Sequence, residues 1–193
     1  MDTIVESPAA VHRLVMLAFP LAQSLDITGP LEVFTAANAL RRAQGVAPYY
    51  QLVLAAAEAG PVVTSCGITL HAEASYHAAG LRPDTLMLAG GDGARLLDDP
   101  RAIGRIRQLA EAAPRVATIC TGVFPLAATG LLNGRRTVTH WQRADLLAGR
   151  FPKLIVDADT LFTSDGKYHT SAGVSAGIDL ALALVEQDLG RDL

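Results

Sequence analysis

The chain has 193 residues, of which 50% are hydrophobic and 18% charged, so it has enough apolar material for one large core and is not intrinsically disordered. The formal net charge is −3 and Lys and Arg form no block, so the chain carries no electrostatic signature of nucleic-acid binding. No apolar run is long enough to span a bilayer, the first residues lack a secretory signal, and the two cysteines show no metal-ligand spacing; we expect a cytoplasmic protein without a metal or cofactor.

The N-terminal part predicts a strand followed by a helix. A continuous apolar run at 14–19 is typical of a strand that is covered on both faces. Apolar residues at helical spacing between 31 and 40 predict the helix, with Pro30 in its first turn. Asp26 is then expected in the loop before this helix, at the carboxyl end of the strand. It is either a turn or capping carboxylate or an acid near Cys120.

The middle of the chain predicts further strands of this sheet. Apolar strands are expected at 50–57 and 85–89, and a small antiparallel addition is expected within 62–70. The strand expected at 85–89 leads directly into Gly90-Gly91. A glycine pair at a strand end allows backbone N–H groups to approach a ligand closely, but it also suits a simple tight turn.

The stretch around Cys120 organises the chain. After a helix expected at 98–113, a short β-type run at 116–119 precedes Cys120, and apolar residues at helical spacing follow Thr121. A strand that turns sharply into a helix at a small nucleophile exposes that side chain at the carboxyl end of the sheet, where the helix start favours a thiolate. Cys120 is therefore a candidate nucleophile, oxidation sensor or ligand contact, although free cysteines are also commonly buried core residues.

The C-terminal part contains one further candidate side chain. His140 is expected to open a helix, where it either approaches Cys120 as a base or packs against Trp141. The Asp-Gly pair at 165–166 predicts a hairpin. The long apolar segment at 174–188 predicts a helix that is buried in the core or at a subunit contact.

Strands and helices alternate with short links, which predicts an α/β protein with a mostly parallel sheet and helices on both faces. The chain shows no internal repeat, low-complexity segment or second domain. We therefore expect residues 1–193 to form a single domain, with a flexible segment at 1–11.

Several segments together resemble one family: SLDITGPLEVF, LMLAGGDGA, ATICTGVFPLAATGLLNGRRTVTHW and TSAGVSAGIDLALALVEQDLG. They resemble the PfpI-like branch of the class I glutamine-amidotransferase-like superfamily, and more narrowly the N-terminal domain of AraC-type transcriptional regulators. CTG followed by GLLNGRRTVTHW is specific for the branch, and the last segment is more typical of the regulators. The resemblance runs from about His12 to the end and implies a flavodoxin-like three-layer sandwich that commonly forms a dimer.

The resemblance also implies a site. It places Cys120 at the elbow, Asp26 as a nearby carboxylate, the backbone N–H groups of Gly90-Gly91 beside them, and Thr121 next to the thiol. Protease-like members carry His directly after Cys; here Thr121 stands there, which argues against an amidase or peptidase triad. A similar enzyme, isonitrile hydratase, uses a Cys-Thr pair with an Asp, so Cys120 would attack the isonitrile carbon and Asp26 would shuttle the proton.

AraC-type regulators continue past EQDLG into two helix-turn-helix motifs, which the 193 residues lack. We therefore expect either a truncated sensor domain or a natural protein that has lost its DNA-binding domain. DNA would be contacted only through the missing C-terminal domain.

Three hypotheses for the function of this chain follow. The first, which the sequence favours, is a ligand-sensing domain whose effector binds over Cys120, contacts Thr121, His140 and Gly90-Gly91, and biases a homodimer. The second is an isonitrile hydratase-like lyase that uses the cysteine together with Asp26. A third reading is a redox or carbonyl-stress protein with an exposed thiol of low pKa.

Overall fold

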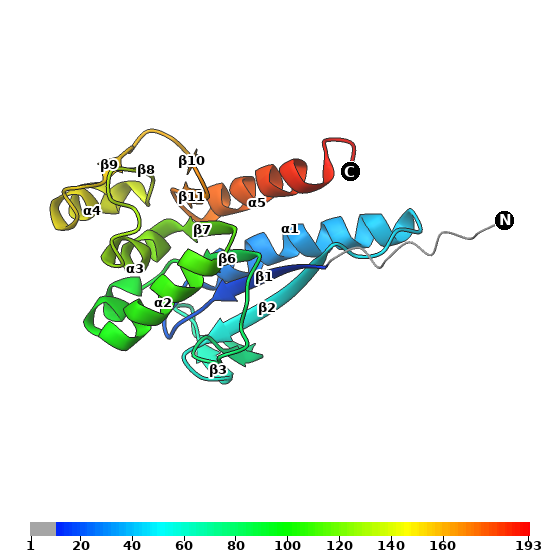
Figure 1. The fold of residues 1–193 in the computed structure, drawn as a ribbon, viewed down its shortest axis with the longest axis horizontal. Helices are drawn as coiled ribbons and strands as arrows, with labels where there is room; N and C mark the ends of the chain where they lie inside the picture. Colours follow the sequence, from blue (N-terminus) through cyan, green and yellow to red (C-terminus); the bar gives the residue numbers. More distant parts are fainter. Residues whose placement is uncertain (1–10) are drawn as a thin grey trace.

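A seven-stranded sheet forms the centre of the protein, whose computed structural model describes residues 11–193, with the side chains of 93–95 excepted (Figure 1). The flexible segment expected at 1–11 lies outside these residues except for its last position. The spatial order of the strands is β10-β11-β7-β6-β1-β2-β5, and only the pair β10 and β11 is antiparallel. The strands are β1 (His12–Leu17), β2 (Tyr50–Ala56), β5 (Ala74–Ser75), β6 (Thr85–Leu88), β7 (Arg115–Ile119), β10 (Phe162–Asp165) and β11 (Tyr168–Ser171).

Helices cover both faces of this sheet, which confirms the predicted flavodoxin-like sandwich. One layer consists of α1 (Ser24–Ala43) and α5 (Val174–Leu189), which lie side by side (Figure 1). The opposite layer contains α2 (Pro100–Ala112), α3 (Val123–Ala128) and α4 (Ala144–Arg150). Three short 3₁₀ turns join these elements: η1 (Gly93–Asp98), η2 (Cys120–Gly122) and η3 (Trp141–Arg143).

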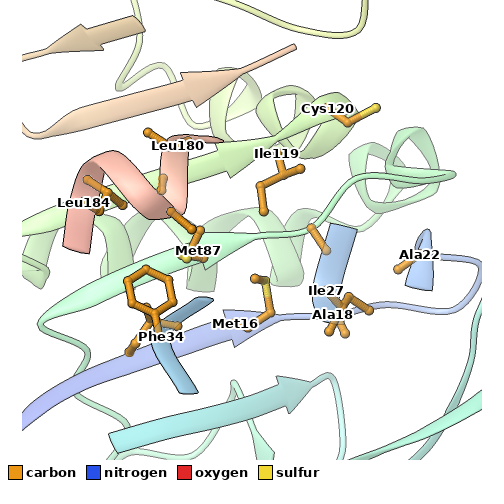
Figure 2. Close-up of a cluster of buried hydrophobic side chains, with 14 of the residues drawn as sticks. Met16, Ala18, Ala22, Ile27, Phe34, Met87, Ile119, Cys120, Leu180 and Leu184 are labelled. Atoms are coloured by element: carbon orange, nitrogen blue, oxygen red, sulfur yellow. The ribbon is translucent and has the colours of Figure 1, made fainter. Parts of the chain in front are cut away.

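The two faces of β1 show why the apolar runs form central strands. Successive side chains of a strand point to opposite faces. Leu14 and Met16 therefore pack with Phe34 of α1, whereas Val15 and Leu17 pack in the layer of α2 and α3. All four strand residues are buried, as expected for a parallel strand that is covered on both sides. Figure 2 shows the first of these clusters.

Two pairs of short strands extend the fold. The predicted antiparallel addition is formed by β3 (Gly60–Val63) and β4 (Thr69–Ala72). The second pair, β8 (Arg136–Thr137) and β9 (Ile155–Val156), is parallel and frames α4. The predicted hairpin at 165–166 joins β10 to β11.

The start of α1 corrects one prediction. The helix begins at Ser24, so Asp26 lies in its first turn rather than in the preceding loop, and Pro30 lies inside the helix rather than in its first turn. The reason is a tertiary contact. Gln23 N–H donates a hydrogen bond to Gly90 O (2.9 Å), and Ala22 forms a β-bridge with the next glycine. This docking fixes the chain against the glycine turn and allows the helix to begin directly afterwards.

The outer surface of α1 and α5 carries an apolar groove of about 490 Å³. Its lining includes Val33 and Leu40 from α1 and Ile178, Leu182 and Val185 from α5. This explains the mostly apolar sequence of α5, because one side of the helix packs on the sheet and another side lines the groove. Within the described residues, no helix combines the length and hydrophobicity needed to cross a membrane.

Candidate functional site

Cys120 stands at the sharp turn between β7 and the helical segment that follows. Its backbone φ is +55°, a left-handed conformation that non-glycine residues adopt rarely and mainly where the surroundings hold them. The turn is possible because Gly122 passes very close to β6: a Cβ on Gly122 would lie 2.3 Å from Leu88 O and 2.7 Å from Ala89 O. Figure 2 shows the Cys120 sulfur pointing away from the packed cluster.

Asp26, Gly90 and Cys120 form one tight group. A Cβ built on Gly90 would lie 2.3 Å from Asp26 Oδ2 and 2.6 Å from Cys120 Cβ, so only glycine fits between the two side chains. The carboxylate comes from α1, the glycine follows β6 and the cysteine follows β7. The structure thus brings together the three groups that the sequence placed far apart.

Burial dominates the electrostatics of this group. Asp26 is fully buried and neither of its oxygens has a hydrogen bond of good geometry within the described residues. Burial raises the pKa of Asp26 to about 6, although the nearby Gly90 N–H and Cys120 thiol offset part of the effect. Burial, reinforced by the Asp26 charge, raises the pKa of Cys120 to about 11. The cysteine is therefore a thiol at neutral pH, not the thiolate that a helix start favours.

Thr121 connects the cysteine turn to the glycine turn. Its hydroxyl donates to Gly91 O (2.7 Å) and accepts from Gly91 N–H (2.8 Å). The Gly91 N–H, which was expected to face a ligand, is therefore already paired with Thr121. No local sequence pattern indicates this contact, because it depends on how β6 and β7 end side by side.

A cavity of about 430 Å³ opens over the cysteine, within the usual range for small-molecule sites. Cys120, Thr121, Gly91 and His140 line it, whereas Asp26 and Gly90 are not among its described lining residues. The carboxylate is therefore buried next to the cysteine and outside the described lining of the cavity. Further lining residues that sequence reasoning missed are Leu21, Gln23, Ser65, Asp92, Gln142 and Arg143.

His140 packs against Trp141, one of its two predicted positions, whereas its role as a base stays a prediction. It lines the cavity with Cys120, and its ring stacks on Trp141 with 5.8 Å between the ring centroids. Its Nδ1 accepts a hydrogen bond from Gln142 N–H (3.3 Å). Only Nε2 therefore remains to serve a ligand or a proton transfer.

This arrangement can move a proton between a thiol and a buried carboxyl group. A carboxyl group with a pKa of about 6 exchanges its proton near neutral pH, which suits general acid–base chemistry. It can equally hold a neutral thiol against a bound ligand. No group of three or more His, Cys, Asp or Glu side chains suited to a metal occurs within residues 11–193.

The second cysteine has the opposite character. Cys66 is exposed, its sulfur lies within hydrogen-bond distance of the hydroxyls of Ser24 (3.3 Å) and Thr64 (3.4 Å), and hydrogen bonding lowers its pKa to about 7. Thr64 already donates its one proton to Ile68 O, so Ser24 is the donor able to stabilise the thiolate. The exposed thiol of low pKa in this chain is therefore Cys66.

We predict that iodoacetamide at neutral pH alkylates Cys66 well before Cys120, because only thiolates react. Ser24→Ala should slow the labelling of Cys66 and leave that of Cys120 unchanged. Peptide mass spectrometry over a time course measures both thiols in the same sample. Faster labelling of Cys120 would show that its thiol is less protonated than burial implies. It would also support the hypothesis that Cys120 is a redox-active thiol.

The sequence matches the model of the DJ-1/PfpI family over residues 12–187. It is 34% identical to isonitrile hydratase of Pseudomonas putida over 91% of this chain and 72% of the enzyme. It is also 32% identical to the HTH-type transcriptional regulator GlxA of Rhizobium meliloti over 93% of this chain. That match spans only 53% of the regulator.

The fold has solved counterparts. A putative transcriptional regulator protein from Vibrio parahaemolyticus superposes with a TM-score of 0.80 at 24% sequence identity, covering 94% of each chain. At this identity the likeness concerns the fold alone. Both the curated matches and the site geometry bear on what this fold does here.

Proposed function

The chain belongs to the DJ-1/PfpI family, and from this membership we propose that it is a ligand-sensing regulatory domain that binds a small molecule in the cavity over Cys120. The observation that carries the proposal is the cavity itself, which has the size of a metabolite site and a protonated thiol at its base. A protonated thiol is a good contact surface but a weak nucleophile. Relatives named as transcriptional regulators support the same reading.

Protection of the thiol tests this proposal. Small metabolites are screened for slower alkylation of Cys120 by iodoacetamide, with Cys66 as the internal reference in every sample. An effector should protect Cys120 alone, and it should also change the fluorescence of Trp141, the single tryptophan, which stacks on His140. If no compound protects Cys120 selectively, the sensing function is rejected.

We propose that residues 1–193 form one sensing domain that acts as a cytoplasmic homodimer. DNA would be contacted through a helix-turn-helix domain outside these residues, since the chain has a net charge of −3. In GlxA the matched segment is about half of the protein, which leaves room for such a domain there. The apolar groove between α1 and α5 offers the surface that a dimer needs to bury.

Leu182→Glu should convert the dimer to a monomer, because a charge would be buried without a partner in the apolar contact. Leu182 is 53% exposed in the single chain, so the substitution leaves the fold intact. Leu161→Glu is the matched control, since Leu161 is 61% exposed and does not line the groove. Sedimentation velocity distinguishes the states, and an unchanged profile for Leu182→Glu would place the contact elsewhere.

A second candidate, an isonitrile hydratase-like lyase, is favoured by the contact of Asp26 with Cys120 and by the enzyme's 34% identity to this chain. The Cys120 sulfur would bond to the isonitrile carbon while Asp26 relays the thiol proton to that carbon, giving a thioimidate. Addition of water would then release the N-substituted formamide and return the thiol. Each step conserves atoms and electrons and needs no oxidant or reductant.

Turnover of cyclohexyl isocyanide, followed as formation of the formamide by mass spectrometry, tests the lyase. Cys120→Ala should abolish turnover and Asp26→Asn should lower it roughly 100-fold or more, the usual value of a general acid–base group. Cys66→Ala should retain full activity. A wild-type protein that hydrates no isonitrile removes this candidate and leaves the sensing proposal in place.

A further inference from the structure

Arg143 is the only permanent cation among the described residues that line the cavity. It lines both the cavity over Cys120 and a smaller adjoining one of about 150 Å³, and the two share Gly91, Asp92 and Thr121. Its guanidinium forms no ion pair with any residue in the described part of the chain. By contrast, Asp92 is engaged in an interaction of its own.

The position of Arg143 is not explained by the stability of the helix it precedes. It occupies the N-cap of α4 without a side-chain capping bond. N-caps favour Ser, Thr, Asp or Asn, and the start of a helix disfavours cations. Its backbone is nevertheless fixed, since Arg143 N–H donates to His140 O (2.7 Å). The turn therefore holds a cation beside the histidine that lines the same cavity.

From these contacts we propose that Arg143 binds a carboxylate of the small molecule that occupies the cavity; this inference rests on the ligand-binding function proposed above. A guanidinium pairs with a carboxylate through two parallel hydrogen bonds. The described lining of the cavity has one cation and one acidic residue, Asp92, and Asp26 is buried nearby, so the cavity suits a single negative charge better than a phosphate dianion. The adjoining cavity adds Phe124 and Leu146, which suit a short alkyl group.

Iodoacetate and iodoacetamide form a matched pair of probes for this proposal. Each alkylates a thiol: the sulfur–carbon bond forms, the carbon–iodine bond breaks, iodide leaves and the thiol proton passes to solvent. They differ in carrying a carboxylate or a neutral amide. The ratio of their rates at Cys120, divided by the same ratio at Cys66, therefore measures how far the cavity favours a carboxylate, whatever the pKa of each thiol.

Arg143→Ala should lower this normalised ratio roughly threefold to tenfold, the effect of one charge-assisted pair that remains partly open to solvent. Arg143→Lys should keep part of the preference, because it keeps the charge but not the two-bond geometry. Arg150→Ala is the matched control: Arg150 is an exposed cation of the same helix, does not line the cavity, and should leave the ratio unchanged. Acetate should slow the alkylation of Cys120, whereas acetamide and inorganic phosphate should not.

Three outcomes would overturn the inference. A ratio that is equal in wild type and Arg143→Ala rejects the role of Arg143, and protection by phosphate but not by acetate rejects the carboxylate. An equal loss in Arg150→Ala would reduce the effect to general surface charge. In these cases selective protection of Cys120 by a neutral compound would still support ligand sensing. Failure of both reagents to reach Cys120 would reject the site over the sulfur and the sensing proposal with it.

Discussion

Gly122→Ala is expected to destabilise the protein by about 3 kcal/mol or more, at the upper end of the cost of overpacking. The added Cβ would lie 2.3 Å from Leu88 O and 2.7 Å from Ala89 O. Both atoms belong to the backbone of the central sheet or its immediate continuation, so no side-chain rotation relieves the overlap. The turn after β7 would have to move away from β6, and Cys120 would move with it.

Urea denaturation measures this change, and Gly104→Ala provides a control of opposite sign. Gly104 lies inside α2, and apart from its own stretch of helix no described atom comes within 4 Å of a Cβ built there. Alanine in an open helical position should stabilise the protein by about 0.5–1 kcal/mol. A Gly122→Ala protein as stable as wild type would mean that β6 and the turn are not held in close contact.

Asp26→Asn is expected to stabilise the protein above about pH 7, by up to about 3 kcal/mol, while removing its capacity for proton transfer. Burial raises the pKa of Asp26 from 3.8 to about 6. Between these values the folded state binds more protons than the unfolded state, so the free energy of unfolding falls as pH rises. Above about pH 6 the folded protein must hold a buried charge, which the asparagine avoids.

The pH dependence distinguishes this explanation from a general gain in packing. The difference in free energy of unfolding between variant and wild type should be close to zero at about pH 3.5 and should reach its full size by about pH 7.5. Asp179→Asn, on the exposed side of α5, is the control for the asparagine substitution itself. A constant difference across this range would contradict a raised pKa for Asp26.

The same variant links stability to the chemistry of the thiol. The Asp26 charge is the second cause, after burial, of the raised pKa of Cys120. Its removal should lower the pKa of the thiol and speed alkylation at a fixed pH. A carboxyl group that reduces both stability and thiol reactivity is costly to the fold, and the proton-transfer role proposed for the lyase would explain its presence.

The sheet and its two helical layers could be predicted from the amino-acid sequence alone. An apolar run such as 14–19 is stable as a strand only when both of its faces are buried. The alternation of strands with helices makes the sheet mostly parallel. The elbow at Cys120 was predictable for the same reason, because a buried strand that stops at Cys-Thr-Gly must turn at the sheet edge. The resemblance of the chain to a known family indicated Asp26 as the carboxylate next to Cys120.

The protonation and surroundings of the thiol follow instead from how distant segments pack together. A pKa depends on the solvent and charges around a group, and these come from α1, β6 and β7 together. The pairing of Thr121 with Gly91 and the entry of Arg143 into the cavity likewise join segments separated by tens of residues. Local sequence patterns report the periodicity of single elements, whereas a binding site is made where the ends of several elements meet.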